Sequence, residues 1–273
     1  MSQARALFEA GKLDEAIEAL LAEVKANPSD PVRRTFLFEL SCFTGDWARA
    51  ERQLDVIGHQ SAQAELGVMV YRANIGAEQE RERVFREGVQ PHFLKEPPPY
   101  IDLHIEAIKQ ILAGKTAEAR ATLDRAEEER PAFSGKFDGK EFEDFRDYDD
   151  VVAPVLELIV KDKYVWMPLE QIRRFEVAPP KSLRDLLWAG AKIEALDGTV
   201  GEVYMPALYA ETSEQSDSQV RLGRMTDWKP LGDDVLRTVG LRLFTVGGEE
   251  KSLFEAKSVE FNEVPQQAQG APS

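Results

Sequence analysis

Apolar residues recur with helical spacing through the first part of the chain. From Leu13 onward they stand at positions i, i+3, i+4, i+7, i+8 and i+11, which form one stripe along an α-helix. This helix follows Gly11, and the same pattern starts again at Gly45, 34 residues later, and at Gly114, 69 residues after that. A tetratricopeptide (TPR) repeat has a period of 34 residues, so the copies are one period apart, then two periods plus one residue apart.

Each copy predicts two antiparallel helices joined at the glycine. A small alanine at the matched position, Ala16, Ala50 or Ala119, lets the two helices approach closely, while larger apolar residues fill the space between them. A single pair cannot bury its stripe, so the pairs must stack. The alternative is a helical bundle in which the spacing arises by chance. We therefore predict a TPR-like α-α superhelix as an N-terminal domain, residues 1–140.

Helix boundaries follow from the glycines and prolines. The predicted helices cover residues 2–10, 12–26, 31–43, 47–58, 62–90, a span from Pro99 to Gly114, and a last one that ends near Pro131. Residues 62–90 match the repeat poorly, so we expect one or two helices there, with a boundary near Gly76.

The apolar period changes from 3.6 to 2 near residue 160. Short alternating runs and the two-residue hairpin signal Asp197-Gly198 predict antiparallel strands, with a second hairpin at Gly247-Gly248. We therefore predict a smaller, mainly antiparallel β domain, barrel-like and with short helices, over residues 141–262. The predicted strands cover residues 164–168, 193–196, 199–203, 220–225, 239–246 and 259–261.

Less regular segments complete the second half. Residues 133–150 carry a run of acids and aromatics, which we interpret as a boundary segment with a solvated charged face. We expect short helices at 150–161 and at 183–189, the latter opened by a capping box at Ser182 and closed by Gly190, and an exposed loop at 211–219. The last residues, 263–273, have nothing to pack and are predicted to be disordered.

Composition narrows the class of protein. The chain has 273 residues, enough for two domains, and a net charge of −15, which disfavours nucleic acid and anionic membranes as partners. The single cysteine, Cys42, cannot form an internal disulfide and falls within an apolar helix, where it reads as a buried thiol. We find neither a signal peptide nor an apolar run long enough to span a membrane, so we expect a cytoplasmic protein.

Few residues have the spacing of a known catalytic, cofactor-binding or metal-binding motif. The three histidines, His59, His92 and His104, have no metal-ligand spacing. Residues 135–140 are one residue short of a phosphate-binding P-loop and lack its Ser or Thr. The acid run at 138–150 could hold a cation, but the spacing of a calcium loop is missing. Trp188 and Trp228 are candidate interface anchors, although Trp188 fits a core position better.

The second half contains stretches that together match one known family. They are Asp150–Glu157, Tyr164–Pro168, Pro180–Trp188, Asp197–Val203, Pro206–Tyr209 and Arg221–Trp228. With these stretches and the N-terminal repeats, nearly the whole chain resembles the ImpE (TagJ) family of type VI secretion accessory proteins.

This resemblance implies a non-enzymatic, cytoplasmic adaptor of a bacterial type VI secretion system. Members of the family are associated with the small subunit of the contractile sheath, and through it with the AAA+ ATPase that recycles contracted sheath. The resemblance brings no catalytic residue. We accordingly expect no catalytic, cofactor-binding or metal-binding residues, no cofactor, and neither nucleic acid nor membrane among the partners.

Two functions remain open from the sequence. The first is a protein-binding adaptor whose stacked helix pairs hold an amphipathic helix with a basic edge, from the small sheath subunit. The second is an enzyme or regulator with its site in the β domain, for which the repeats recruit a substrate. The repeat register places the following residues in the groove of the adaptor: Val32, Thr35, Glu39, Phe43, His104 and Ile108.

Overall fold

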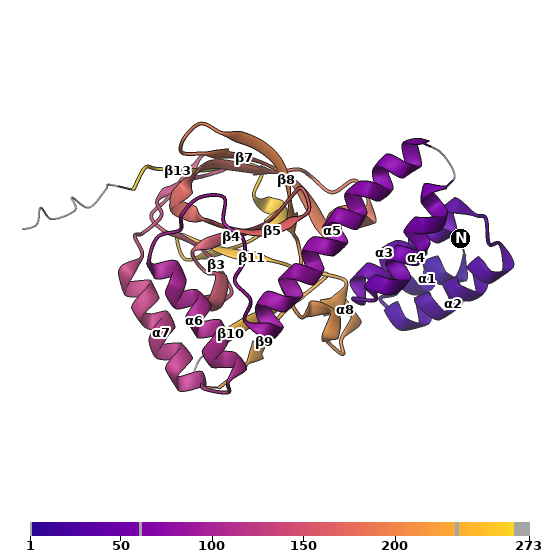
Figure 1. Cartoon of the computed structure of the whole chain (residues 1–273), viewed down its shortest axis with the longest axis horizontal. Coiled ribbons are helices and arrows are strands. Elements are labelled where there is room, and N and C mark those ends of the chain that lie inside the picture. The colour runs from indigo at the N-terminus through magenta and orange to yellow at the C-terminus, as the bar shows by residue number, and fades with distance from the viewer. Residues whose placement is uncertain (1, 60–61, 233–234, 265–273) are drawn as a thin grey trace, which may run out of the picture.

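Helices make up the first half of the chain and antiparallel strands most of the second, as the sequence predicts (Figure 1). The computed structural model describes residues 2–59, 62–232 and 235–264. The helices are α1 (Gln3–Glu9), α2 (Leu13–Ala26), α3 (Pro31–Phe43), α4 (Trp47–Gly58), α5 (Ala62–Glu87), α6 (Tyr100–Leu112), α7 (Thr116–Glu129) and the short α8 (Ser218–Arg221). The strands are β1 (Gly135–Phe137), β2 (Lys140–Phe142), β3 (Phe145–Asp147), β4 (Val155–Val160), β5 (Lys163–Pro168), β6 (Ile172–Val177), β7 (Trp188–Ala195), β8 (Val200–Pro206), β9 (Thr226–Pro230), β10 (Leu236–Gly240), β11 (Leu243–Val246), β12 (Glu249–Ser252) and β13 (Val259–Phe261).

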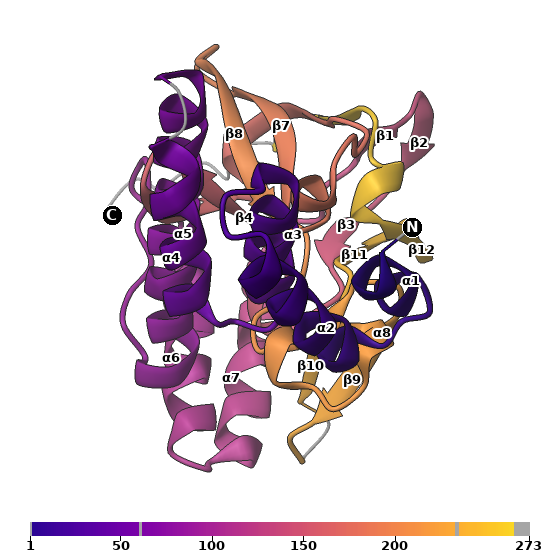
Figure 2. The same ribbon diagram turned by 90° about the vertical axis from the view of Figure 1, so that its right-hand side faces the viewer.

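The three repeat copies form the helix pairs α1–α2, α3–α4 and α6–α7. Their glycines adopt positive φ angles, with values of 77°, 67° and 73° at Gly11, Gly45 and Gly114, a conformation that glycine reaches without strain. The matched alanines Ala16, Ala50 and Ala119 are fully buried. The third pair lies apart from the first two, at the opposite end of α5 (Figures 1 and 2).

Helix α5 differs from the prediction, because it runs unbroken through Gly76. A Cβ at Gly76 would meet no atom within 4 Å, so this glycine marks neither a turn nor a close approach. The helix packs on α4 along much of its length and on β5 near its end. Contacts with two different parts of the molecule stabilise one long helix where the local pattern indicates a break.

The strands form three antiparallel sheets within the described ranges. The largest has the order β2-β1-β13-β6-β7-β8-β4-β5, and the smaller ones are β10-β9 and β12-β11-β3. The hairpin at Asp197-Gly198 joins β7 to β8, and β13 closes the sheet between β1 and β6, both as predicted. The core between the sheets is aromatic: the rings of Phe145 and Phe244 lie 4.9 Å apart, and Phe175 and Phe261 pack against them.

Several local predictions in the second half are wrong. Residues 150–161 hold a single 3-10 turn followed by β4, because this apolar run pairs with β5 on one edge and β8 on the other. Periodicity alone cannot separate a buried strand from a buried helix in so short a run. The helix at 183–189 is a 3-10 turn with the expected capping box at Ser182, but β7 begins at Trp188 and passes through Gly190.

The remaining differences come from turns. Residues 220–225 are the end of α8 and a turn, because Asp217 caps that helix and Gly223 takes a positive φ. The strand expected at 239–246 is divided into β10 and β11 after Gly240, whose φ is also positive. The loop at 211–219 is only partly exposed, since Thr212 is buried and its hydroxyl accepts a hydrogen bond from the backbone of Gly240.

The chain enters the largest sheet at Gly135, before the division expected at residue 140. Residues 135–140 form the β1–β2 hairpin, and a Cβ at Gly135 would clash with the carbonyl of Glu260. Of the tail expected to be disordered, residues 263–273, only the first two belong to the described part. No helix in that described part has the length and apolar character that crossing a membrane requires.

The close packing at Ala50 is testable. Replacing Ala50 with Leu should overpack the contact between α3 and α4 and lower the free energy of unfolding by about 1–3 kcal/mol. Ala48→Leu, on the exposed side of the same helix, is the matched control and should change it by less than about 0.5 kcal/mol. Denaturant titration measures both, and equal midpoints for Ala50→Leu and wild type would show that the repeat register is wrong.

Candidate functional site at the junction of helices and sheets

The structure does not bring the six predicted groove residues together. Val32 is 75% exposed and Thr35 is half-buried, whereas Glu39, Phe43, His104 and Ile108 are buried. The four residues on α3 and the two on α6 also lie apart, with α5 running between the two helices (Figure 1). The expected continuous groove across all six residues is therefore not present.

The concave side of α3 is covered by other parts of the same chain. Phe38 packs on Tyr71 of α5 and on Trp188 at the start of β7. The Glu39 carboxylate lies 3.5 Å from Arg184, and burial raises the pKa of Glu39 to about 7 although that arginine opposes the shift. The face that would bind a partner in an isolated repeat is filled here by α5 and β7.

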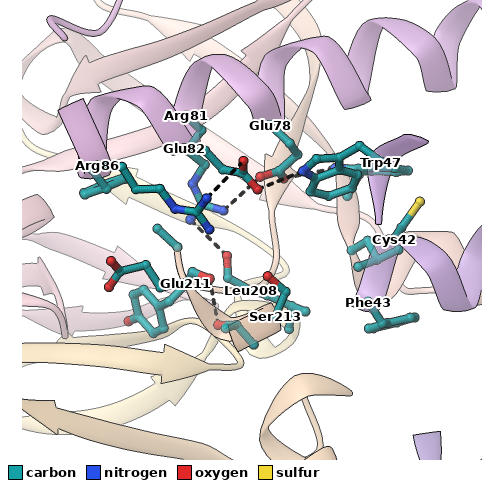
Figure 3. Close-up of a pocket in the computed structure, with 16 residues that line it drawn as sticks. Cys42, Phe43, Trp47, Glu78, Arg81, Glu82, Arg86, Leu208, Glu211 and Ser213 are labelled. Atoms are coloured by element: carbon teal, nitrogen blue, oxygen red, sulfur yellow. Dashed lines mark hydrogen bonds and ion pairs between the residues drawn. The ribbon is translucent and has the colours of Figure 1, made fainter. Parts of the chain in front are cut away.

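A pocket remains where α3, α4 and α5 meet β7 and the loop at 208–213, and we name it the junction pocket (Figure 3). Its volume is about 50 Å³, which is room for a few ordered waters. The indole N–H of Trp47 donates to Glu82 at 2.8 Å, and that of Trp188 donates to Glu78 at 3.1 Å. Arg81 donates to the carbonyl of Leu208 at 3.0 Å. These polar groups hold the junction together.

Phe43 and Cys42 also line the junction pocket, at the end of α3. Burial raises the pKa of the Cys42 thiol well above its ordinary value. A thiolate is the reactive form of cysteine, so this burial makes Cys42 a poor nucleophile, as the buried-thiol interpretation predicts. Burial likewise raises the pKa of Glu78, against the neighbouring Arg81.

A buried cluster of charges lies behind the pocket, centred on Glu157 of β4. Arg81 of α5 donates from Nε to this carboxylate at 2.7 Å, and Arg242 pairs with both Glu157 and Asp147. The Tyr209 hydroxyl donates to Asp147 at 2.8 Å. All five residues are at most 3% exposed. We call them the Glu157 cluster.

The Glu157 cluster keeps its charges because each has a partner. Burial disfavours the ionised form of Glu157, but the charges of Arg242 and Arg81 outweigh burial and lower its pKa. Burial has the larger effect at Asp147, whose pKa rises to about 6. Arg81 and Tyr209 also line the junction pocket, but the carboxylates and arginines of the cluster are paired with one another, so the cluster suits a structural role better than catalysis.

The acid run at 138–150 is only in part the solvated face expected from the sequence: Asp138, Glu141 and Glu143 are exposed, and the other acids are partly or fully buried. Asp147 and Asp149 are each 1% exposed and pair with Arg242 and Arg237. Asp144 pairs with Arg130, and Asp150 with Arg120 and Arg146. Among the described residues, no group of three or more His, Cys, Asp or Glu side chains is arranged to hold a metal ion.

Sequence reasoning did not identify the arginines of these pairs. The hydrogen bonds from Arg81 and Arg242 to Glu157 join residues 76 and 85 positions apart. Such separations leave no local pattern. The only signal in the sequence was the density of acids in the run itself, which requires counter-charges from somewhere if the run is buried.

His104 faces the interior and not a groove. Its Nδ1 lies 3.0 Å from the carbonyl of Val151, and its Nε2 has no hydrogen-bond partner among the described residues. Burial lowers the pKa of this imidazole from 6.5 to about 4, more than the hydrogen bond to Val151 raises it. The neutral ring is therefore the form that packs between α6 and the 3-10 turn at Asp150–Val152.

A shallow groove lies between α1 and α2, and we name it the α1–α2 groove. Its volume is about 530 Å³, and Leu7, Ala19 and Ala22 supply apolar contacts. Glu15, Glu18 and Glu23 give it an acidic lining. A surface that binds an amphipathic helix with a basic edge is expected to have an apolar floor and an acidic rim, and the α1–α2 groove has both.

Glu157→Gln tests the structural role of the cluster. The amide leaves two buried arginines facing a neutral group, so the free energy of unfolding should fall by about 3–5 kcal/mol. Glu118→Gln, which removes an exposed partner of Lys115, should cost less than about 1 kcal/mol. Similar denaturant midpoints for the two variants would contradict the role given to Glu157.

His104 should make the fold sensitive to acid. Because the folded state holds the pKa of His104 at about 4, below the ordinary 6.5, the stability linked to the neutral ring is present above pH 6.5 and is lost as the pH falls toward 4. Integrated from pH 7.5 to pH 5, this loss is about 2 kcal/mol. His104→Gln should lose that much less over the same range in urea titrations, and parallel pH profiles would refute the assignment.

Comparisons with known proteins agree with this architecture. A family profile described as ImpE protein matches residues 139–260. The type VI secretion system accessory component TagJ of Pseudomonas aeruginosa is 36% identical over 258 residues, which are 94% of this chain and 90% of the relative. The crystal structure of protein VPA1032 from Vibrio parahaemolyticus shares the fold, with a TM-score of 0.88, 24% identity, and coverage of 97% of this chain and 99% of that one. The chain belongs to the ImpE (TagJ) family.

Proposed function

We propose that this protein is a type VI secretion accessory component that acts in the cytoplasm as a protein-binding adaptor. In this proposal it binds an amphipathic helix of the small contractile-sheath subunit and links it to the AAA+ ATPase that recycles the sheath. The observation that carries the proposal is the 36% identity, over 94% of the chain, to a protein named as such an accessory component. Identity of this extent makes a shared role the simplest expectation.

The surface chemistry of the helical half supports an adaptor. The α1–α2 groove offers apolar contacts between carboxylates, and Glu18 forms no ion pair within the described ranges. A partner helix could bury its apolar stripe on the apolar residues of the groove, and the basic residues along its edge could pair with the carboxylates. Val32 and Thr35 on α3 stay in the proposal as neighbouring contacts. The proposal no longer includes the four buried residues, because a partner could reach them only after the fold opened. These residues are Glu39, Phe43, His104 and Ile108.

The alternative from the sequence was an enzyme or regulator with a site in the β domain. An open pocket that gathers ionisable groups with shifted pKa values would favour it. The Glu157 cluster has the shifted pKa values, but its carboxylates and arginines are buried and paired with one another. The cluster therefore gives this alternative little support compared with the adaptor.

The function is tested by binding. The purified chain should capture the small sheath subunit of the same bacterium, and the AAA+ ATPase should join the complex. Failure of the wild-type chain to bind either protein at micromolar concentration would contradict the proposed function.

The surface is tested by charge reversal. Glu18→Lys should weaken binding of the sheath subunit's helix by about tenfold or more, with a smaller effect at high salt, because it places a cation against the basic edge. Glu51→Lys on α4 makes the same change at an exposed site outside the groove and should bind as wild type does. Calorimetric titration of both variants gives the comparison, and equal affinities would remove the α1–α2 groove from the proposal.

A further inference from the structure

A second concave surface lies between the first half of α5 and the outer face of the largest sheet. Val70 of α5 forms one wall, β6, β7 and β8 form the floor, and Phe254 and Lys257 close the far side. The volume is about 810 Å³. We name it the α5–sheet groove.

The groove continues into an exposed apolar stripe on α5. Leu66, Met69 and Val70 are 67%, 62% and 40% exposed, and their spacing of three and four residues puts them on one side of the helix. Together with Tyr204 of β8, which shares a sheet face with Gly190, they form an apolar surface of the kind that marks protein-binding sites. The helix α5 is held in place from its other end, through Arg81, so this stripe is presented without needing a partner for its own fold.

The floor of the groove favours a helix as the bound element. Strand β7 pairs with β6 along one edge and with β8 along the other, so its backbone groups are already hydrogen-bonded. An extended peptide laid across this floor would leave its own N–H and C=O groups without partners. A helix satisfies its backbone internally and needs only apolar side chains that fill the groove.

Charge indicates the polar side of such a helix. Glu176 is paired with Arg174, and Glu202 stands opposite Lys192 in the strand register. Lys257 forms no ion pair with any described residue, although the chain as a whole carries a net charge of −15. A carboxylate on the bound helix would give Lys257 the counter-charge that the chain itself does not supply.

We infer that the α5–sheet groove is a docking surface for one amphipathic helix of a second protein, apolar toward Val70 and Tyr204 and carrying a carboxylate toward Lys257. The inference rests on the proposed function, since an adaptor that links two proteins needs a surface for each. The helix bound here has an acidic edge, in contrast with the basic edge that suits the α1–α2 groove. The two grooves therefore select different partners.

Filling the groove is the sharpest test, and Gly190 allows it. A Cβ added to this floor residue would meet only the Cβ of Ala178, at 3.9 Å, so Gly190→Val should fold normally and occupy the space of the bound helix. Gly201 is also a strand glycine, on β8, with no atom within 4 Å of its added Cβ, and it does not line the groove. Gly201→Val is therefore the matched control.

A second pair of variants tests the apolar wall of the groove, with one variant in the wall and one control outside it. Val70→Asp replaces an apolar groove contact with a carboxylate, and Val56→Asp makes the same change on α4, where Val56 is exposed to a similar extent, 37% against 40%. Lys257→Glu reverses the charge that should select the acidic edge. Denaturant titration of all five variants checks that each one is folded.

The probes are the full-length small sheath subunit and the full-length AAA+ ATPase of the same bacterium, each titrated against immobilised chain. Each of the three groove variants, Gly190→Val, Val70→Asp and Lys257→Glu, should weaken the binding of the same probe by about tenfold or more and leave the binding of the other probe unchanged. Both controls should bind the two probes as wild type does. Glu18→Lys should weaken the binding only of the other probe, whose affinity the three groove variants leave unchanged.

Other results overturn the inference. If the wild type binds both probes and the three groove variants bind them equally well, the groove is not a docking surface, and the proposed function stands. If Gly190→Val converts a wild-type dimer into a monomer in light scattering, the groove is occupied by a second copy instead. If the wild type binds neither probe, the proposed function fails and the inference fails with it.

Discussion

The ionised carboxylate of Glu157 joins the helical and β-rich parts of this protein. It lies in β4, yet its two cationic partners come from α5 and from the segment between β10 and β11. Moving these charges out of water costs several kcal/mol per ion, and only their close pairing offsets that cost. Any position of α5 that withdrew Arg81 would leave a buried charge without its partner, so the cluster fixes the helix relative to the sheets.

The fixed position of α5 decides which surfaces are available. Because α5 and β7 cover the concave side of α3, the groove expected of stacked repeats is filled by the chain's own residues. Helix α5 packs on α4 (Figure 2), and its first half, at Val70, also lines the groove beside the largest sheet. Two of the concavities in the described part lie on different parts of the molecule, one acidic between α1 and α2 and one apolar beside α5.

The features that could be predicted from the sequence are those set by neighbouring residues. Gly11, Gly45 and Gly114 mark the helix turns because each needs a positive φ, and Asp197-Gly198 marks a hairpin for the same reason. The features that could not be predicted depend on distant pairing. Residues 155–160 become a strand because β5 and β8 flank them. Four predicted groove residues, Glu39, Phe43, His104 and Ile108, are buried, because the repeat register says nothing of what later segments of the chain place against α3 and α6. The functional proposal rests on the family resemblance, because no catalytic or metal-binding motif in the sequence indicates a function.

The central proposal is that this chain holds two partners on two separate surfaces, the α1–α2 groove and the α5–sheet groove. Hydroxyl-radical footprinting of the ternary complex with the small sheath subunit and the AAA+ ATPase tests it most directly, because it reports the solvent exposure of individual side chains. The account predicts that one partner protects Leu7 in the α1–α2 groove and that the other protects Leu66 and Met69 on α5. Protection of both sets by the same partner alone, or of neither set in an intact complex, would contradict it.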